Sequence, residues 1–332
     1  MTFPIGLKLS GCGVYRPRHR RPSTELDQRF GQVSGWTEEK FGIAARGVAG
    51  PDETSSYMAA EAGRIALDEA GWGSDFDLIV GACGVMEQPI PGTSVLVQHA
   101  LGLGKSGIHC LDINMTCLSF LSALDVVALG FAAGRWKRAL IVSGDIATAG
   151  LDYSHPEMSA IFGDGAAAVC VEAADTDGPA LLSARFQTFG DGKELAHLKS
   201  GGTRIRIEHG FEALSEGARF HMNAFGIFKT TGKHLPKMIA AVTADAGLTP
   251  DAIDTVICHQ ASQPGLEYVR HLIGVRPERV VDIFADTGNQ IAASLPTALC
   301  AARGQGRLTP GSHALLLGTS AGVSVGAMVL RF

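Results

Sequence analysis

Two segments of this chain, separated by about half its length, share one pattern: an acidic residue near the end of a predicted helix, then a glycine, then an apolar strand. The first copy is DEAGWGSDFDLIV at residues 68–80, and the second is DAGLTPDAIDTVI at residues 245–257. Each copy predicts a helix that ends at a glycine, followed by a short loop and a buried strand. A repeat of this size indicates duplication of a whole domain and argues against a solenoid of short repeats.

Further segments extend the repeat. Residues 99–113 match residues 271–283, and the apolar strand at 138–144 matches the one at 313–318. Alternating helices and apolar strands favour mixed, mostly parallel sheets that are covered by helices. The sequence therefore predicts an α/β protein made of two pseudo-symmetric halves.

The first half is expected at residues 1–175 and the second at residues 176–332. No linker separates them, so we expect one rigid unit. Open α/β sheets build their sites at the carboxyl ends of strands. The chemistry is therefore expected where strand ends and helix starts of the two halves meet.

Composition limits the possible partners and compartments. The net charge is −5 and only 18% of residues are charged, which argues against binding to nucleic acid or to an acidic membrane surface. Neither a secretory signal nor a membrane span is recognisable. The seven cysteines are odd in number and form no C-x-x-C pair, which argues against a disulfide framework and a zinc site. We expect a cytoplasmic protein.

Cys117 is the first candidate for chemistry. It opens a long apolar run at 116–134, directly after the strand-like segment 108–113. In the first turn of a buried helix, unpaired N–H groups and the helix dipole favour a thiolate, which would suit an acyl-transfer nucleophile. The alternative is a small core cysteine, and position alone does not separate the two.

Two more candidates follow predicted strands. His259 ends the strand at 254–258, and Asn289 follows the strand at 280–284 at the start of a helix. In the repeat, Asn289 lies near the position equivalent to Cys117, so the two would face each other across the pseudo-twofold axis. Each alone is more often a core residue or a helix cap, but the combination at equivalent strand ends is specific.

Several short motifs carry a resemblance over essentially the whole chain. They are Thr116-Cys117, FGDGA at 162–166, His259-Gln260-Ala261, Gly288-Asn289 with AASLP at 292–296, GTSAG at 318–322 and the closing LRF. With these motifs in this order, the chain resembles the β-ketoacyl-acyl-carrier-protein synthase III family of the thiolase superfamily. The resemblance implies a thiolase-like fold with layers in the order αβαβα.

The resemblance also implies a Cys117-His259-Asn289 triad. Cys117 would attack an acyl thioester such as an acyl-CoA, and the N–H groups of Cys117 and Ala321 would form the oxyanion hole. His259 and Asn289 would stabilise the enolate formed when a malonyl thioester loses carbon dioxide. This chemistry needs no metal or redox cofactor.

Substrate-binding roles are implied for further residues. Trp36 would stack on the adenine of coenzyme A, with Lys40 where an arginine is usual, and Lys229 would help to dock an acyl carrier protein. Ile90 would reach across a homodimer to cap the partner's acyl pocket. Phe225 and Phe228 are expected near that pocket.

Departures from the family pattern leave alternatives open. Ser262 stands where a basic docking residue is usual, which suggests a divergent member. One alternative is an acyltransferase that passes the acyl group from Cys117 to an alcohol or amine without decarboxylation. A degradative thiolase is disfavoured because residues 318–326 contain no second cysteine, and a non-catalytic subunit is disfavoured because the candidate nucleophile and histidine are present.

Overall fold

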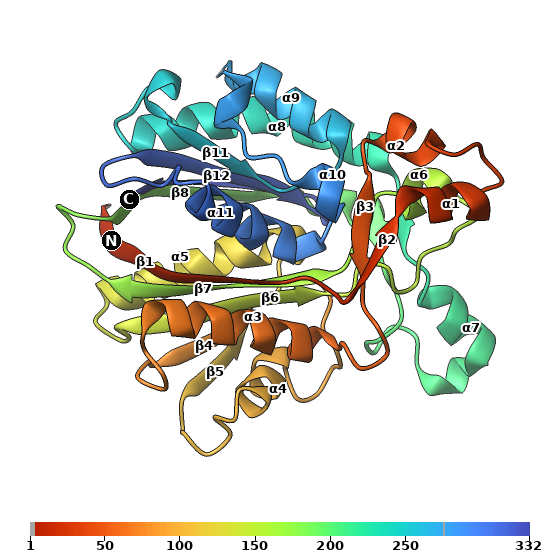
Figure 1. Cartoon of the computed structure of the whole chain (residues 1–332), viewed down its shortest axis with the longest axis horizontal. Coiled ribbons are helices and arrows are strands. Elements are labelled where there is room, and N and C mark those ends of the chain that lie inside the picture. The colour runs from red at the N-terminus through yellow and green to blue at the C-terminus, as the bar shows by residue number, and fades with distance from the viewer. Residues whose placement is uncertain (1–3, 275) are drawn as a thin grey trace.

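The computed structural model describes residues 4–274 and 276–332. Its main sheet has nine strands in the order β11-β12-β13-β8-β1-β7-β6-β4-β5 (Figure 1). These strands are β1 (Ile5–Tyr15), β4 (Leu78–Gly81), β5 (His109–Asp112), β6 (Arg138–Asp145), β7 (Gly165–Ala173), β8 (Ala180–Thr188), β11 (Thr255–Cys258), β12 (His313–Ser320) and β13 (Ser324–Arg331).

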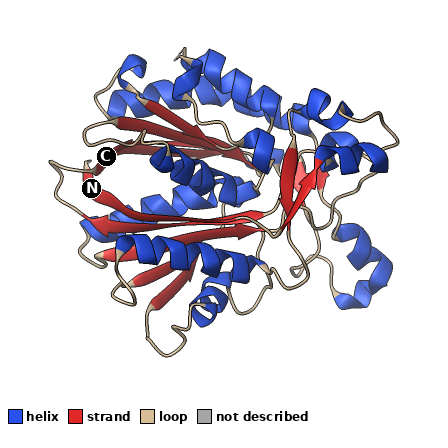
Figure 2. Ribbon diagram, viewed as in Figure 1, coloured by secondary structure: helices blue, strands red, loops and turns tan. Residues whose placement is uncertain are grey.

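Six helices pack on or between these strands (Figure 2). They are α3 (Ser55–Ala70), α4 (Thr93–Ala100), α5 (Ser119–Ala132), α8 (Ala224–Asp245), α9 (Gln263–Ile273) and α11 (Ser294–Gly304).

Smaller elements complete the described chain. The short strands and helices are β2 (His19–Pro22), β3 (Ala45–Val48), β9 (Ala196–His197), β10 (His221–Met222), α1 (Ser23–Arg29), α2 (Trp36–Phe41), α6 (Pro156–Ser159), α7 (Gly210–Gly217) and α10 (Phe284–Thr287). The 3₁₀ turns are η1 (Thr116–Leu118), η2 (Gly190–Gly192), η3 (Ile207–His209), η4 (Pro250–Ala252), η5 (Pro277–Arg279) and η6 (Ile291–Ala293).

The elements form the five layers that the resemblance implied. Helices α5 and α11 lie between the two halves of the sheet, α3 and α4 cover one outer face, and α8 and α9 cover the other (Figure 1). The sheet is mixed: β4 pairs in parallel with β5 and β6, β11 pairs in parallel with β12, and the remaining ladders are antiparallel. The predicted α/β class is confirmed.

Helix α5 is buried on nearly all sides, as its apolar sequence predicts. Phe120, Leu121, Leu124 and Val127 are all buried and belong to a cluster that also includes residues of both halves of the sheet. Full burial of each such side chain contributes roughly 1.5–3 kcal/mol. The start of α5, next to Cys117, is therefore held firmly in the middle layer.

The hydrogen bonds at the strand starts repeat between the halves. Asp77 Oδ2 accepts a hydrogen bond from Arg138 N at 3.0 Å, and Asp254 Oδ2 accepts one from His313 N at 2.9 Å. From the centre of the sheet outward, the order is β1-β7-β6-β4 on one side and β8-β13-β12-β11 on the other. We infer that β4 corresponds to β11 and β6 to β12, with a pseudo-twofold axis between β1 and β8.

Candidate active site

Cys117 lies in the 3₁₀ turn η1, between the end of β5 and the start of α5. Two side chains hold this turn: Asn114 Oδ1 accepts a hydrogen bond from Thr116 N at 2.9 Å, and Ser119 Oγ accepts one from Met115 N at 2.9 Å. Thr116 has a φ of 49°, a left-handed conformation that costs a β-branched residue on the order of 1–3 kcal/mol. Sequence reasoning had placed Cys117 in the first α-helical turn; it lies one turn earlier.

The same turn occurs again at η6, before α11. Asn289 Oδ1 accepts a hydrogen bond from Ile291 N at 2.9 Å, and Ser294 Oγ accepts one from Gln290 N at 3.1 Å. Ile291 has a φ of 51°. Two strained turns with the same side-chain support therefore precede the two central helices.

The repeated turn gives the register between the halves. Asn289 corresponds to Asn114, and the counterpart of Cys117 is Ala292. The sequence analysis had placed Asn289 near the counterpart of Cys117, and this register puts it three positions before it. The nucleophile candidate and Asn289 thus occupy different positions of one motif.

His259 follows β11, and its backbone N–H donates a hydrogen bond to Leu317 O at 3.0 Å. The equivalent hydrogen bond in the other half runs from Ala82 N to Val142 O at 2.7 Å. Its side chain is buried, and its Nδ1 has no hydrogen-bond partner among the residues described.

The three candidates converge on the end of β12. A Cβ on Gly318 would meet Leu118 Cδ2 at 2.9 Å and His259 Cβ at 3.1 Å, so η1 and His259 both pack against this glycine. Asn289 Nδ2 donates a hydrogen bond to Ala261 O at 3.4 Å, two residues beyond His259. Cys117, His259 and Asn289 therefore lie on segments that contact one another between the two halves.

Burial dominates the electrostatics of this site. Cys117 retains partial solvent access, but the surrounding protein and, secondarily, the charge of Asp145 raise the pKa of its thiol to about 12. Burial lowers the pKa of His259 to about 4. The free site therefore holds a neutral thiol and a neutral imidazole. The thiolate expected at a helix start is therefore disfavoured, because burial outweighs the backbone hydrogen bond that lowers the pKa of Cys117.

Comparison with known proteins identifies the family. The family model described as 3-oxoacyl-[acyl-carrier-protein] synthase III matches residues 111–190, and its C-terminal counterpart matches residues 243–332. β-Ketoacyl-[acyl-carrier-protein] synthase III of Neisseria meningitidis is 32% identical over 326 residues, covering 98% of this chain and 99% of that protein. The protein of the same name from Rhodospirillum rubrum is 32% identical over 330 residues, covering 97% and 98%. The chain belongs to the β-ketoacyl-[acyl-carrier-protein] synthase III family.

Solved structures of this family agree with the fold. The 3-oxoacyl-[acyl-carrier-protein] synthase III of Aquifex aeolicus has a TM-score of 0.88 at 27% identity, covering 98% of this chain and 100% of that one. The priming β-ketosynthase of the R1128 polyketide pathway also has a TM-score of 0.88 at 27% identity, covering 100% and 98%. The thiolase-like fold is confirmed, and the chain is a condensing enzyme of the acyltransferase class.

Trp36 and Lys40, the predicted coenzyme A contacts, lie together on α2. Lys40 Nζ is 4.7 Å from the centre of a Trp36 ring and 3.2 Å from Glu157 Oε1. Asp27 holds the start of the helix by accepting hydrogen bonds from Gly35 N and Thr37 N, both at 2.7 Å. The lysine charge is therefore already paired with a carboxylate.

The other predicted substrate contacts are spread over several segments of the chain. Ile90 is 86% exposed on the loop between β4 and α4, and Lys229 is exposed on α8. Ala321 lies in the turn that joins β12 to β13. Phe225 and Phe228 are 75% and 46% exposed, so these two aromatic rings do not enclose a pocket within the single chain.

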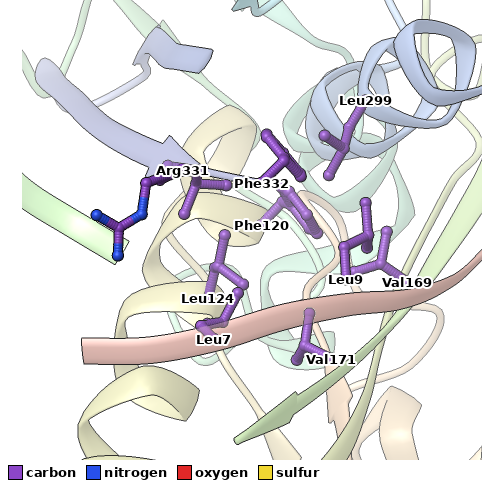
Figure 3. A pocket seen from close by; sticks show the side chains of 10 residues that line it. Leu7, Leu9, Phe120, Leu124, Val169, Val171, Leu299, Arg331 and Phe332 are labelled. Atoms are coloured by element: carbon purple, nitrogen blue, oxygen red, sulfur yellow. The ribbon is translucent and has the colours of Figure 1, made fainter. Parts of the chain in front are cut away.

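A separate apolar cavity lies between β1, α5, α11 and the C-terminal residues (Figure 3). None of the predicted site residues lines it. Its lining consists of Leu7, Leu9, Phe120, Leu124, Val169, Val171, Leu299, Leu330, Arg331 and Phe332.

Sequence reasoning missed Asp145, the last residue of β6. It is fully buried, and it accepts hydrogen bonds from backbone N–H groups of both halves. The only signal in the sequence is an aspartate at the end of the apolar strand 138–145.

The pKa of Cys117 predicts how its reactivity depends on pH. Thiolate forms only as the pH rises through the thiol pKa, so alkylation of the free enzyme by iodoacetamide should still increase above pH 9. An ordinary thiol, with a pKa of about 8.5, levels off soon after that value. The measurement is the rate of Cys117 adduct formation, followed by peptide mass spectrometry from pH 6 to pH 10.

A short unstructured peptide with one cysteine and blocked termini supplies the control in the same buffers, because its thiol is fully solvated and has the ordinary pKa. A Cys117 profile that levels off below pH 8 would show that the free site stabilises a thiolate, contrary to this account.

Proposed function

We propose that Cys117 accepts an acyl group from an acyl thioester and that the enzyme condenses it with a malonyl thioester, with loss of carbon dioxide. The observation that carries this proposal is the convergence of Cys117 and Asn289, on equivalent turns of the two halves, beside the buried His259. A simple acyl transfer has no enolate to stabilise and does not require Asn289.

In the first step, the sulfur of Cys117 attacks the carbonyl carbon of the acyl thioester. The N–H groups of Cys117 and Ala321 donate hydrogen bonds to the oxyanion. The bond to the donor sulfur then breaks, and the thiol proton passes by way of His259 to the departing sulfur. A neutral imidazole is the form that can accept this proton, as the lowered pKa of His259 implies.

In the second step, a malonyl thioester takes the place of the departed thiol. His259 and Asn289 donate hydrogen bonds to its thioester oxygen while the bond to the carboxylate breaks and carbon dioxide leaves. The enolate carbon attacks the acyl-cysteine, and the bond to Cys117 sulfur breaks. This gives a β-ketoacyl thioester and a Cys117 thiolate, which takes up a proton from solvent to regenerate the thiol. Neither a metal nor a redox cofactor is needed.

The substrates would be delivered as coenzyme A or carrier-protein thioesters. Lys229, Lys233 and Lys237 are exposed at intervals of four residues on α8, and none is paired with an acid among the described residues. They form a basic ridge suited to an acidic carrier protein. Trp36 would stack on the adenine of coenzyme A, but Lys40 would have to leave Glu157 to bind its phosphates.

We also propose a homodimer in the cytoplasm. Ile90, on its exposed loop, would reach the acyl pocket of the partner subunit and set its depth. The seven cysteines are all unpaired, which suits a reducing compartment. Within the part of the chain that the structure describes, no helix has the length and apolarity to cross a bilayer.

Intact-protein mass spectrometry tests the first step directly. Incubation with a series of acyl-CoA thioesters should add one acyl group to the wild type and none to Cys117→Ala. Cys110→Ala, a matched change in the strand before the site, should acylate normally. A malonyl thioester added after acylation should remove the acyl group from Cys117 and release a β-keto product.

The outcomes separate the candidate functions. Absence of any Cys117 adduct with coenzyme A or carrier-bound donors would overturn the proposal. An adduct that malonyl thioester does not discharge, but an alcohol or amine does, would make the enzyme an acyltransferase of the alternative kind.

Asn289→Asp tests the second step. The variant keeps an oxygen for the hydrogen bond from Ile291 N, so the turn is retained, but it loses the Nδ2 donor. We expect acylation of Cys117 close to the wild-type rate and decarboxylation slowed by about 10²–10³-fold, the usual cost of one oxyanion-hole donor. Radiolabelled carbon dioxide released from malonyl thioester measures it. Equal loss of both steps would show that Asn289 has only a structural role.

A further inference from the structure

Asp145 brings together three segments around the site. Its Oδ1 accepts hydrogen bonds from Gly84 N at 2.8 Å and Val85 N at 2.9 Å, and its Oδ2 accepts one from Ala293 N at 3.2 Å. The carboxylate is fully buried and forms no ion pair among the residues described. A buried charge is costly unless hydrogen bonds satisfy it, and here only backbone N–H groups do so.

These contacts fix the turn that carries Asn289. Ala293 N belongs to η6, four residues after Asn289 and two after Ile291. A Cβ on Gly84 would meet Ile291 Cγ2 at 2.2 Å and Asp145 Oδ1 at 3.3 Å, so this turn packs closely on the segment after β4. The carboxylate lies at the junction of the two halves and satisfies N–H groups from each of them.

The counterpart of Asp145 in the second half is neutral. When the paired strands β4 and β6 are aligned with the paired strands β11 and β12, the last residue of β6, Asp145, corresponds to the last residue of β12, Ser320. The counterpart of Ala293 is Leu118, immediately after Cys117. At η6 a carboxylate thus satisfies the N–H groups of the turn, whereas at η1 no carboxylate stands in the equivalent position.

We propose that Asp145 is a positioning residue of the condensing reaction. Its carboxylate fills the anion-binding position at the start of η6 and so holds Asn289 in place. The equivalent position at η1 stays open and receives the acyl oxygen. The inference rests on the proposed function. The difference between Asp145 and Ser320 then decides which half binds the acyl group and which supports decarboxylation.

Electrostatics support this assignment. The buried titratable groups that face Asp145 are the thiols of Cys83 and Cys117, and its charge adds to burial in raising the pKa of both. Burial raises the pKa of Asp145 itself to about 7, because its effect is larger than that of the backbone hydrogen bonds that lower this pKa. A carboxylate here helps to keep Cys117 protonated until a thioester binds.

Asp145→Asn is the first test, because it keeps the side-chain shape. An amide cannot accept at both ends, so at least one of the three N–H groups loses its acceptor. We expect carbon dioxide release at saturating malonyl thioester to fall at least tenfold, with a smaller change in KM. Loss of the charge should also move the alkylation profile of Cys117 to lower pH, because the charge of Asp145 helps to raise the pKa of this thiol.

Asp164→Asn is the matched control. Asp164 is equally buried and accepts hydrogen bonds from Ala49 N, Thr148 N and Thr148 Oγ1, each at 2.8 Å. Its replacement should lower the Tm without moving the alkylation profile. If Asp145→Asn leaves that profile unchanged and slows decarboxylation no more than Asp164→Asn does, the residue is only structural and the proposal fails.

Ser320→Asp is the reciprocal test, and it does not depend on the folding of the first variant. A carboxylate at this position would occupy the place of the acyl oxygen, so acylation of Cys117 should fall by two orders of magnitude or more in a variant that retains the wild-type circular dichroism spectrum. Acylation at the wild-type rate would overturn the proposal. The alkylation comparison of Asp145→Asn with Asp164→Asn needs no substrate, so it can be made even if no acyl donor is accepted.

Discussion

The close approach of the turns η1 and η6 in the middle layer is the constraint on which the site depends. Each turn follows a strand, contains a residue with positive φ and leads into a central helix that both sheet halves bury. An asparagine and a serine support each turn in the same way. Duplication of one half thus creates two equivalent helix starts, each with an asparagine, and their divergence places Cys117 in one turn and Ala292 in the other.

Burial of this junction has a cost and a use. It makes the thiolate of Cys117 and the imidazolium of His259 unfavourable, so the free enzyme is uncharged at both groups. The same lack of water strengthens each hydrogen bond that forms to a charged intermediate. A thioester oxygen that becomes negative in the reaction therefore gains more from backbone and amide donors here than it would in water.

Much of this was accessible from the sequence, because its signals are local. The repeat of helix, glycine and strand predicted paired α/β halves, and positions after strands predicted Cys117, His259 and Asn289 as one group. The 3₁₀ turn and its positive φ were not predicted, since no residue type at 116 or 291 demands them. An isoleucine at positive φ even argues against such a turn.

The missed features depend on contacts between distant parts of the chain. Asp145 meets partners 61 and 148 positions away, and Lys40 meets Glu157, 117 positions away. Neither pairing leaves a periodic pattern in the sequence. The neutral state of Cys117 was missed for the same reason, because desolvation is set by the packing of both halves around the thiol.

The central claim is that the helix start at Cys117 receives the acyl oxygen, because the carboxylate that Asp145 supplies at η6 has no counterpart at η1. A crystal structure of the enzyme acylated on Cys117 measures this most directly. The account predicts the acyl oxygen about 2.7–3.1 Å from the backbone nitrogens of Cys117 and Ala321, the range of a formed oxyanion hole. An acyl oxygen that points away from both nitrogens, with Cys117 acylated, would contradict it.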